Sequence, residues 1–89
     1  MKLKELFTDE SKWQKKKLAT DARGELCMTD SPQAVRFCLL GAIHLCYPGN
    51  AQNIRDCVCE YLNGSITTWN DAPERTFADV KELVERLNI

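Results

Sequence analysis

The sequence predicts a mainly α-helical fold, a small bundle of about four helices with a minor hairpin or irregular loop near residues 17–27. Two observations predict this class. Apolar residues recur at three- and four-residue spacings, and capping or turn residues separate the segments that carry them. The chain has 89 residues, 44% hydrophobic and 28% charged, which is an ordinary globular composition. At this length we expect one domain, residues 1–89.

The N-terminal part of the chain contains two short predicted elements. Apolar residues at helical spacing predict a first helix over residues 2–7. Short semi-apolar runs then lie on both sides of Gly24, which favours the hairpin or structured loop over residues 17–27. We expect Gly24 to supply a positive φ angle in that turn.

The central helix is predicted to begin at Ser31-Pro32, because serine is a good N-cap and proline fits the first helical position. A broad apolar stripe makes this helix the most buried element. The stripe consists of Val35, Phe37, Cys38, Leu39, Leu40, Ala42, Ile43, Leu45 and Cys46. Pro48-Gly49 ends the helix, since proline cannot continue it.

A third helix is predicted over residues 51–62, with Asn50 as its N-cap and Asn63-Gly64 at its end. Its expected inner face carries Ile54, Cys57, Val58, Tyr61 and Leu62.

A connecting segment and a last helix complete the prediction. Residues 65–69 are rich in β-branched side chains, and we expect an extended conformation there. Thr76 and Asp79 then resemble a capping box, with Asp in place of the usual Glu or Gln. The last helix follows, with Val80, Leu83, Val84 and Leu87 on one apolar face.

The charge balance argues against a nucleic-acid partner. Twelve basic and thirteen acidic side chains give a net charge of −1, so no global field favours a polyanion. The one local basic cluster is Lys12–Lys17, which could contact phosphates while Trp13 stacks on a base. Acidic residues at Asp9, Glu10 and Asp21 dilute the potential of this cluster. We therefore expect no nucleic-acid partner.

No segment approaches the ~20 apolar residues needed to span a bilayer, and the N-terminus lacks the pattern of a secretory signal. We expect a cytoplasmic protein without a membrane partner. The five cysteines are an odd number in a chain without an export signal, so free thiols that fill the core are expected. On a helix Cys57 and Cys59 diverge by roughly 200° and cannot share one ion. We predict no metal site and no cofactor.

No complete catalytic constellation is visible. His44 is the single histidine, and a Cys–His pair oriented by Asn70 or Asp71 can be assembled only by choosing parts. The four glycines are isolated and form no phosphate loop. We therefore predict no catalytic residues.

The segment Ile66–Phe77 is the best candidate for a docking surface. Trp69 can bury a large apolar area, and Asn70 and Asp71 can bond nearby backbone amides. Arg75 could pair with Asp71 or with another carboxylate. Two interpretations stay open, a rigid connector that fixes the last helix and a partner-binding surface. The candidate binding residues are Trp13, Trp69, Asn70, Asp71 and Arg75.

Three pieces of the chain carry a resemblance to a known family. They are Trp13 with Ala19-Thr20-Asp21-Ala22-Arg23-Gly24, the run Asp30–Ala42, and Trp69-Asn70-Asp71-Ala72-Pro73-Glu74-Arg75-Thr76 with Val80 and Leu83. With these pieces the chain resembles a family of small uncharacterised bacterial and phage proteins, a domain of unknown function. It departs from the family pattern at Phe37, where Trp is frequent, and at Lys16, where Gly is frequent. The resemblance implies a bacterial or phage cytoplasmic setting and no particular activity, cofactor or catalytic residue.

From these observations we expect a small non-enzymatic, cytoplasmic binding or adaptor protein that is phage-related and acts by contact with a protein partner. A homodimer also stays open, because a small chain could cover its apolar helix faces in this way. The alternative function is a small-molecule- or metal-dependent activity that uses His44, the cysteines and Asn70 with Asp71.

Overall fold

The computed structural model describes residues 1–89 and is mainly α-helical, as predicted. Its elements are α1 (Leu3–Leu6), the 3-10 helix η1 (Glu10–Lys12), β1 (Ala19–Thr20), β2 (Arg36–Phe37), α2 (Leu39–Cys46), α3 (Ala51–Leu62), α4 (Ile66–Asp71) and α5 (Phe77–Leu87). The strands form one antiparallel pair, with Ala19 opposite Phe37 and Thr20 opposite Arg36. The helix count is five α-helices, where about four were predicted.

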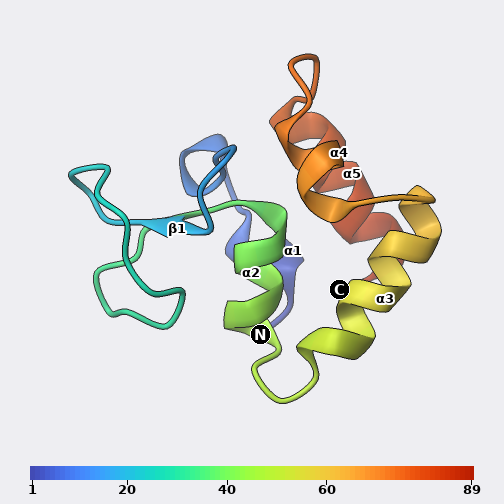
Figure 1. Ribbon diagram of the computed structural model, residues 1–89, viewed down its shortest axis with the longest axis horizontal. Helices are drawn as coiled ribbons and strands as arrows, with labels where there is room; N and C mark the ends of the chain where they lie inside the picture. The colour runs from blue at the N-terminus through green and yellow to red at the C-terminus, as the bar shows by residue number, and fades with distance from the viewer.

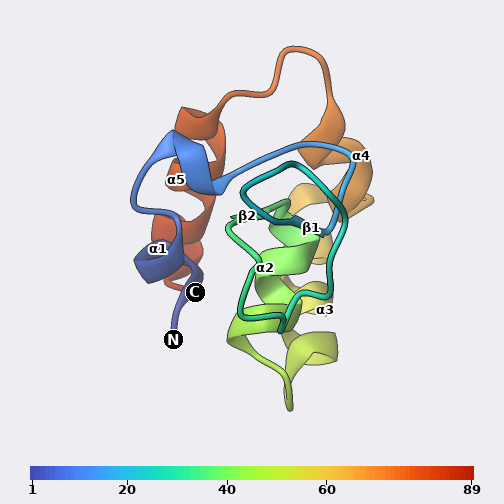
Figure 2. The same cartoon turned by 90° about the vertical axis from the view of Figure 1, so that its left-hand side faces the viewer.

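Helix α2 lies at the centre of the arrangement and contacts α1, α3, α4 and β2 (Figure 1). Helix α5 packs beside α1, and the two chain ends lie close together in Figure 2. The backbone N–H of Lys4 donates to the carbonyl oxygen of Ile89 at 3.0 Å, so the N-terminal helix is tied to the end of the chain.

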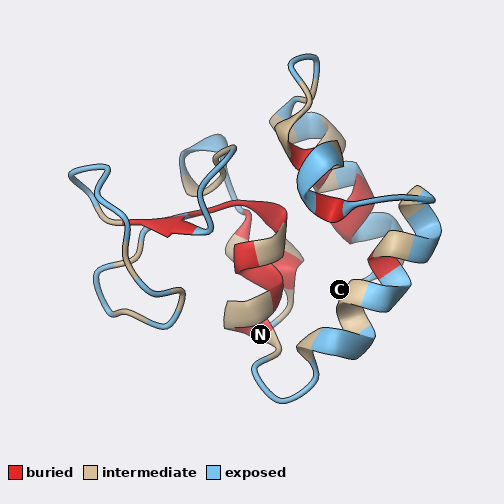
Figure 3. Ribbon diagram, in the orientation of Figure 1, coloured by how far each residue is buried: buried red, intermediate tan, exposed pale blue.

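One hydrophobic cluster forms the core, and its residues come from both ends of the sequence. Figure 3 shows them on β1, on α2 and on the inner faces of α4 and α5. The largest fully buried apolar side chains are Phe7, Leu3, Leu39, Ile43, Val58, Val80 and Val84. Phe7 also meets Phe77 edge-to-face at a centroid distance of 6.3 Å, which is a favourable aromatic geometry.

The predicted start of the central helix at Ser31-Pro32 is wrong. Ser31 begins a turn, in which its hydroxyl and carbonyl oxygens accept bonds from the N–H groups of Gln33 and Ala34. Residues 35–37 pair with β1 and do not form a helix. Val35 N–H donates to the carbonyl oxygen of Thr20 at 2.9 Å, and β2 pairs with β1. The helix begins only at Leu39, so Val35 lies outside it and is 40% exposed.

The loop predicted near residues 17–27 is partly a hairpin. Asp21 N–H donates to the carbonyl oxygen of Glu25 at 3.0 Å, and Gly24 has the expected positive φ, +82°. An isolated bridge joins Thr20 to Leu26. The ladder partner of β1, however, is β2, which lies beyond the predicted loop in the sequence.

Helix α3 has the predicted bounds and ends at Asn63 in the left-handed conformation, with φ +57°. Val58 is buried on its inner face, but Cys57 and Tyr61 are exposed, contrary to prediction.

The extended conformation predicted for residues 65–69 is wrong, because helix α4 occupies this segment. Ser65 caps α4, since its hydroxyl oxygen accepts a bond from the N–H of Thr68 at 3.3 Å. The cap and the burial of Ile66 outweigh the weak helix propensity of the two threonines.

The predicted capping box of α5 is confirmed. Thr76 N–H donates to Asp79 Oδ2 at 3.0 Å, and Asp79 N–H donates to Thr76 Oγ1 at 3.3 Å. Val80, Leu83 and Val84 are buried on the predicted apolar face. None of the helices has the length and the apolar character needed to cross a membrane.

Candidate functional site

Asn70, near the end of α4, is completely buried and makes four hydrogen bonds. Its Oδ1 accepts from Trp13 Nε1 at 2.7 Å and from the backbone N–H of Leu39 at 3.0 Å. Its Nδ2 donates to the carbonyl oxygen of Gln14 at 3.2 Å and to Asp71 Oδ1 at 2.9 Å. Two donors face Oδ1 and two acceptors face Nδ2, so the amide has one satisfied orientation.

These bonds connect three parts of the chain. Leu39 is the first residue of α2, whose N–H has no partner within its own helix, so Asn70 supplies that partner from α4. The bonds to Trp13 and Gln14 hold the segment after η1 against the same helices. Trp13 also packs against Phe77, with ring centroids 6.5 Å apart. Its ring and its indole N–H are therefore both used inside the molecule.

Asp71 and two lysines extend these contacts. Asp71 Oδ1 accepts from the backbone N–H of Lys16 at 2.8 Å, where the chain turns with a φ of +72°. Lys15 Nζ donates to the carbonyl oxygens of Ala72 at 2.7 Å and Pro73 at 3.3 Å. Part of the basic cluster thus holds the turn after α4. We call the hydrogen-bonded set of Trp13, Gln14, Lys16, Leu39, Asn70 and Asp71 the Asn70 network.

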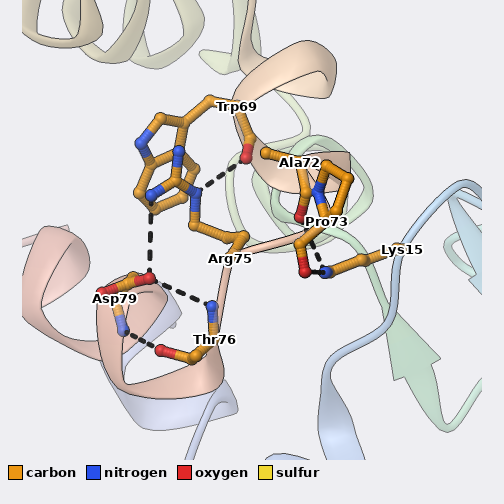
Figure 4. A network of polar contacts seen from close by, with 7 residues as sticks. All are labelled: Lys15, Trp69, Ala72, Pro73, Arg75, Thr76 and Asp79. Atoms are coloured by element: carbon orange, nitrogen blue, oxygen red, sulfur yellow. Dashed lines mark hydrogen bonds and ion pairs between the residues drawn. The ribbon is translucent and has the colours of Figure 1, made fainter.

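Trp69 and Arg75 form a separate pair on the next part of the chain (Figure 4). The Arg75 guanidinium carbon lies 4.0 Å from the Trp69 ring centroid, which is a cation–π arrangement. Arg75 Nε donates to the carbonyl oxygen of Trp69 at 2.8 Å. Its Nη1 lies 3.6 Å from Asp79 Oδ2, so the carboxylate that pairs with Arg75 belongs to α5.

This pair lines a small open groove of about 170 Å³ between the end of α3, α4 and α5. The lining residues are Tyr61, Leu62, Trp69, Arg75, Asp79, Glu82 and Leu83. Tyr61 is 48% exposed at the rim, and Trp69 is half-buried, with part of its surface packed against the core. The groove therefore combines two aromatic rings and two carboxylates from helices α3, α4 and α5 with an arginine from the connection between α4 and α5.

The structure divides the sequence-predicted residues into two groups. Trp13, Asn70 and Asp71 meet in the Asn70 network, whereas Trp69 and Arg75 line the groove. Sequence reasoning missed the contribution of Tyr61 and Glu82 to the groove. The available signal was the position of Tyr61, the penultimate residue of α3, where an amphipathic ring can stay half in solvent.

Neither the cysteines nor His44 lines the groove. Cys38 and Cys46 are buried, which raises the pKa of both thiols, and Cys38 Sγ accepts a bond from Gly41 N–H at 3.3 Å. Cys27 and Cys59 pack against the core, and Cys57 is exposed. No group of three or more His, Cys, Asp or Glu side chains is arranged to hold a metal ion.

Comparison with known families shows the family of this sequence. The model of a family of unknown function, DUF6197, matches residues 3–87. The chain belongs to this family. Comparisons with curated proteins and with solved structures gave no match.

Proposed function

We propose that this chain is a small cytoplasmic binding or adaptor protein, in a bacterial or phage setting, that holds a segment of a partner protein in the Trp69–Arg75 groove. The observation that carries this proposal is the composition of the groove. Trp, Tyr and Arg are the residues enriched at energetic hot spots of protein interfaces. Here Tyr61 from α3, Trp69 from α4 and Arg75 from the connection between α4 and α5 line one groove.

The half-exposed aromatic rings favour an apolar anchor on the partner. Trp69 already has the Arg75 guanidinium on its ring, which orients the indole before any partner arrives. A side chain held in advance loses less conformational entropy on binding. The rim residue Tyr61 adds apolar area next to a polar hydroxyl, which suits a protein surface better than a closed small-molecule pocket.

The charge of the residues around the groove favours a basic side chain next to that apolar anchor on the partner. Residues 38–89 carry four basic and seven acidic side chains, a net charge of −3. Two of these acids, Asp79 and Glu82, line the groove; they form ion pairs with Arg75 and Arg86, so the acidic excess of residues 38–89 as a whole is what favours a cation. We therefore propose a partner segment with a large apolar side chain beside a lysine or arginine, because opposite potentials on the two surfaces give specificity and fast association.

The Asn70 network supports this proposal because it holds in place the helix that carries Trp69. Trp69 and Asn70 are consecutive on α4, so the four bonds of Asn70 fix the helix that presents the Trp69 ring. We propose Trp13, Asn70 and Asp71 as positioning residues and Trp69 and Arg75 as contact residues.

Selection of a random-peptide library on the purified protein tests this function. We expect enriched peptides with an aromatic or aliphatic residue next to Lys or Arg. Tyr61→Ala should weaken their binding by about tenfold, the loss typical of a minor hot spot, and Glu82→Lys should weaken it through charge. Leu26→Ala, which changes a 71% exposed apolar residue near β1, is the matched control and should bind as the wild type does.

Two results would contradict the proposal. Peptides that bind Tyr61→Ala and wild type equally would place the binding surface elsewhere. Failure to enrich any peptide, with all variants shown to be folded by circular dichroism, would remove the groove as a peptide site. Sedimentation of the free protein would reveal whether a second copy occupies the groove instead.

A further inference from the structure

A second cleft is lined by residues of β1 and of the segments next to it. Figure 1 shows β1 on the opposite side of the molecule from α3, α4 and α5, which line the groove. The volume of the cleft is about 340 Å³. The residues that matter here are Gln14, Lys17, Thr20, Asp21, Arg23 and Arg36. Three of the six are cations, and they come from three separate places in the chain.

These cations have no carboxylate partner. The ion pairs of the structure are Arg75–Asp79 and Arg86–Glu82, both on or next to α5. Asp21 is the only acid that lines the cleft. Its Oδ1 accepts bonds from the backbone N–H groups of Arg23 at 2.9 Å and Glu25 at 3.0 Å. The turn holds this carboxylate in place, and against its single negative charge Lys17, Arg23 and Arg36 give the lining of the cleft a net charge of +2.

The floor of the cleft is built from satisfied polar side chains. Gln14 Nε2 donates to the carbonyl oxygens of Lys17 at 3.1 Å and Arg36 at 3.3 Å. Thr20 is 2% exposed, and its hydroxyl donates to Gln14 Oε1 at 2.7 Å. Gln14 thus fixes the backbone positions of two of the three cations relative to each other. Such preorganisation distinguishes the cleft from scattered surface lysines.

The segment that surrounds the cleft, residues 12–36, is also positively charged. Residues 12–36 contain six basic side chains, Lys12, Lys15, Lys16, Lys17, Arg23 and Arg36, against the acids Asp21, Glu25 and Asp30. The segment has a net charge of +3 in a chain whose total is −1. The positive potential is therefore concentrated at this end of the molecule and would attract an anion.

We propose that this cleft binds a phosphate group through Lys17, Arg23 and Arg36. Arginine matches phosphate oxygens with two parallel N–H donors, and lysine adds a point charge. The phosphate could belong to a free phosphate compound or to a nucleic-acid backbone. Trp13 takes no part, because its ring and its indole N–H are already engaged by Phe77 and Asn70.

Titration calorimetry with pyrophosphate, and in parallel with a single-stranded oligonucleotide of about ten nucleotides, tests the proposal. Arg23→Gln and Arg36→Gln change exposed side chains and should each weaken binding by about tenfold or more. Lys81→Gln makes the same change of charge on α5 and should have no effect. Affinity should fall as salt rises, because phosphate contacts are electrostatic.

The two probes identify the source of the phosphate. Binding of pyrophosphate that depends on Arg23 and Arg36 supports a compact phosphate compound as the ligand. Binding of the oligonucleotide alone, with the same dependence, supports a phosphodiester backbone. Two results would overturn the proposal. One is that neither probe binds. The other is that Lys81→Gln weakens binding as much as Arg23→Gln and Arg36→Gln do.

Discussion

Asn70 Oδ1 and Trp13 Nε1 lie 2.7 Å apart, although 57 residues separate them in the sequence. Asn70 is completely buried and also accepts the first N–H of α2. One amide therefore joins the segment after η1, the start of α2 and the end of α4. Removal of Asn70 leaves the indole N–H of Trp13 without a bond, and removal of Trp13 leaves Asn70 Oδ1 with only the bond from Leu39, so the pair should be sensitive to substitution.

Asn70→Ala should lower the free energy of unfolding by about 3 kcal/mol, because it strands the Leu39 N–H and the Trp13 indole N–H. Asn70→Asp should cost a similar amount, since a carboxylate cannot donate to Gln14 and would face Asp71. Trp13→Phe keeps a ring but removes the donor and should cost about 1 kcal/mol. Urea denaturation of the single and double variants gives the coupling energy. Additive losses would contradict a direct Asn70–Trp13 interaction.

Gly41→Ala should destabilise the protein by about 3 kcal/mol, although alanine is the better helix former. A Cβ at this position in α2 would lie 2.0 Å from the carbonyl oxygen of Leu18, and a backbone atom cannot rotate away. Gly49→Ala is the control, because open space surrounds that position. Thermal unfolding of both variants checks this contact. Unchanged stability of Gly41→Ala would show that the Leu18 segment does not pack closely on α2.

Lys16→Gly should stabilise the fold by up to about 1 kcal/mol. Lys16 has a φ of +72°, a region that side-chain-bearing residues adopt at a cost and glycine adopts readily. The N–H of residue 16 still donates to Asp71 in the variant. Lys17→Gly removes the same charge at a position without positive φ, and we expect it to be destabilising. A destabilised Lys16→Gly in a urea titration would argue against the left-handed turn.

The capping box of α5 should make stability depend on pH. The hydrogen bond from the Thr76 N–H holds the pKa of Asp79 below its ordinary value of 3.8. A lowered pKa in the folded state means that the stabilisation is present above pH 3.8 and is lost as the pH falls through the lowered pKa. Wild type should therefore exceed Asp79→Asn in stability at neutral pH, and the difference should shrink in acid. A difference that stays constant from neutral to acid pH would contradict this role of the Asp79 charge.

The elements that could be predicted are those with local signals. Helices α3 and α5 have caps and an apolar stripe within a few residues of each other, so their bounds or caps followed from the sequence. Ser31-Pro32 is an equally good local start signal, but pairing with β1 draws residues 36–37 into a strand. Helix α4 escaped prediction for a related reason, because burial of Ile66 and the Ser65 cap outweigh β-branched residues.

The candidate site was predictable as a set of residues and not as an arrangement. Trp13, Asn70 and Trp69 stand out by type, yet only the fold shows that Trp13 bonds Asn70 while Trp69 faces the groove. The contact between residues 13 and 70 has no local signature. Tyr61 and Glu82 join Trp69 only because α3 and α5 converge there.

Trp69 lines the groove, whereas Trp13 belongs to the Asn70 network. The chain has two tryptophans, so a nitrogen-15 NMR spectrum contains two indole N–H signals, which Trp13→Phe assigns. We would titrate a library-selected peptide into the wild-type protein and follow both signals. We expect the Trp69 signal to shift in a saturable way while the Trp13 signal stays in place. A shift of the Trp13 signal with Trp69 unchanged would contradict this expectation.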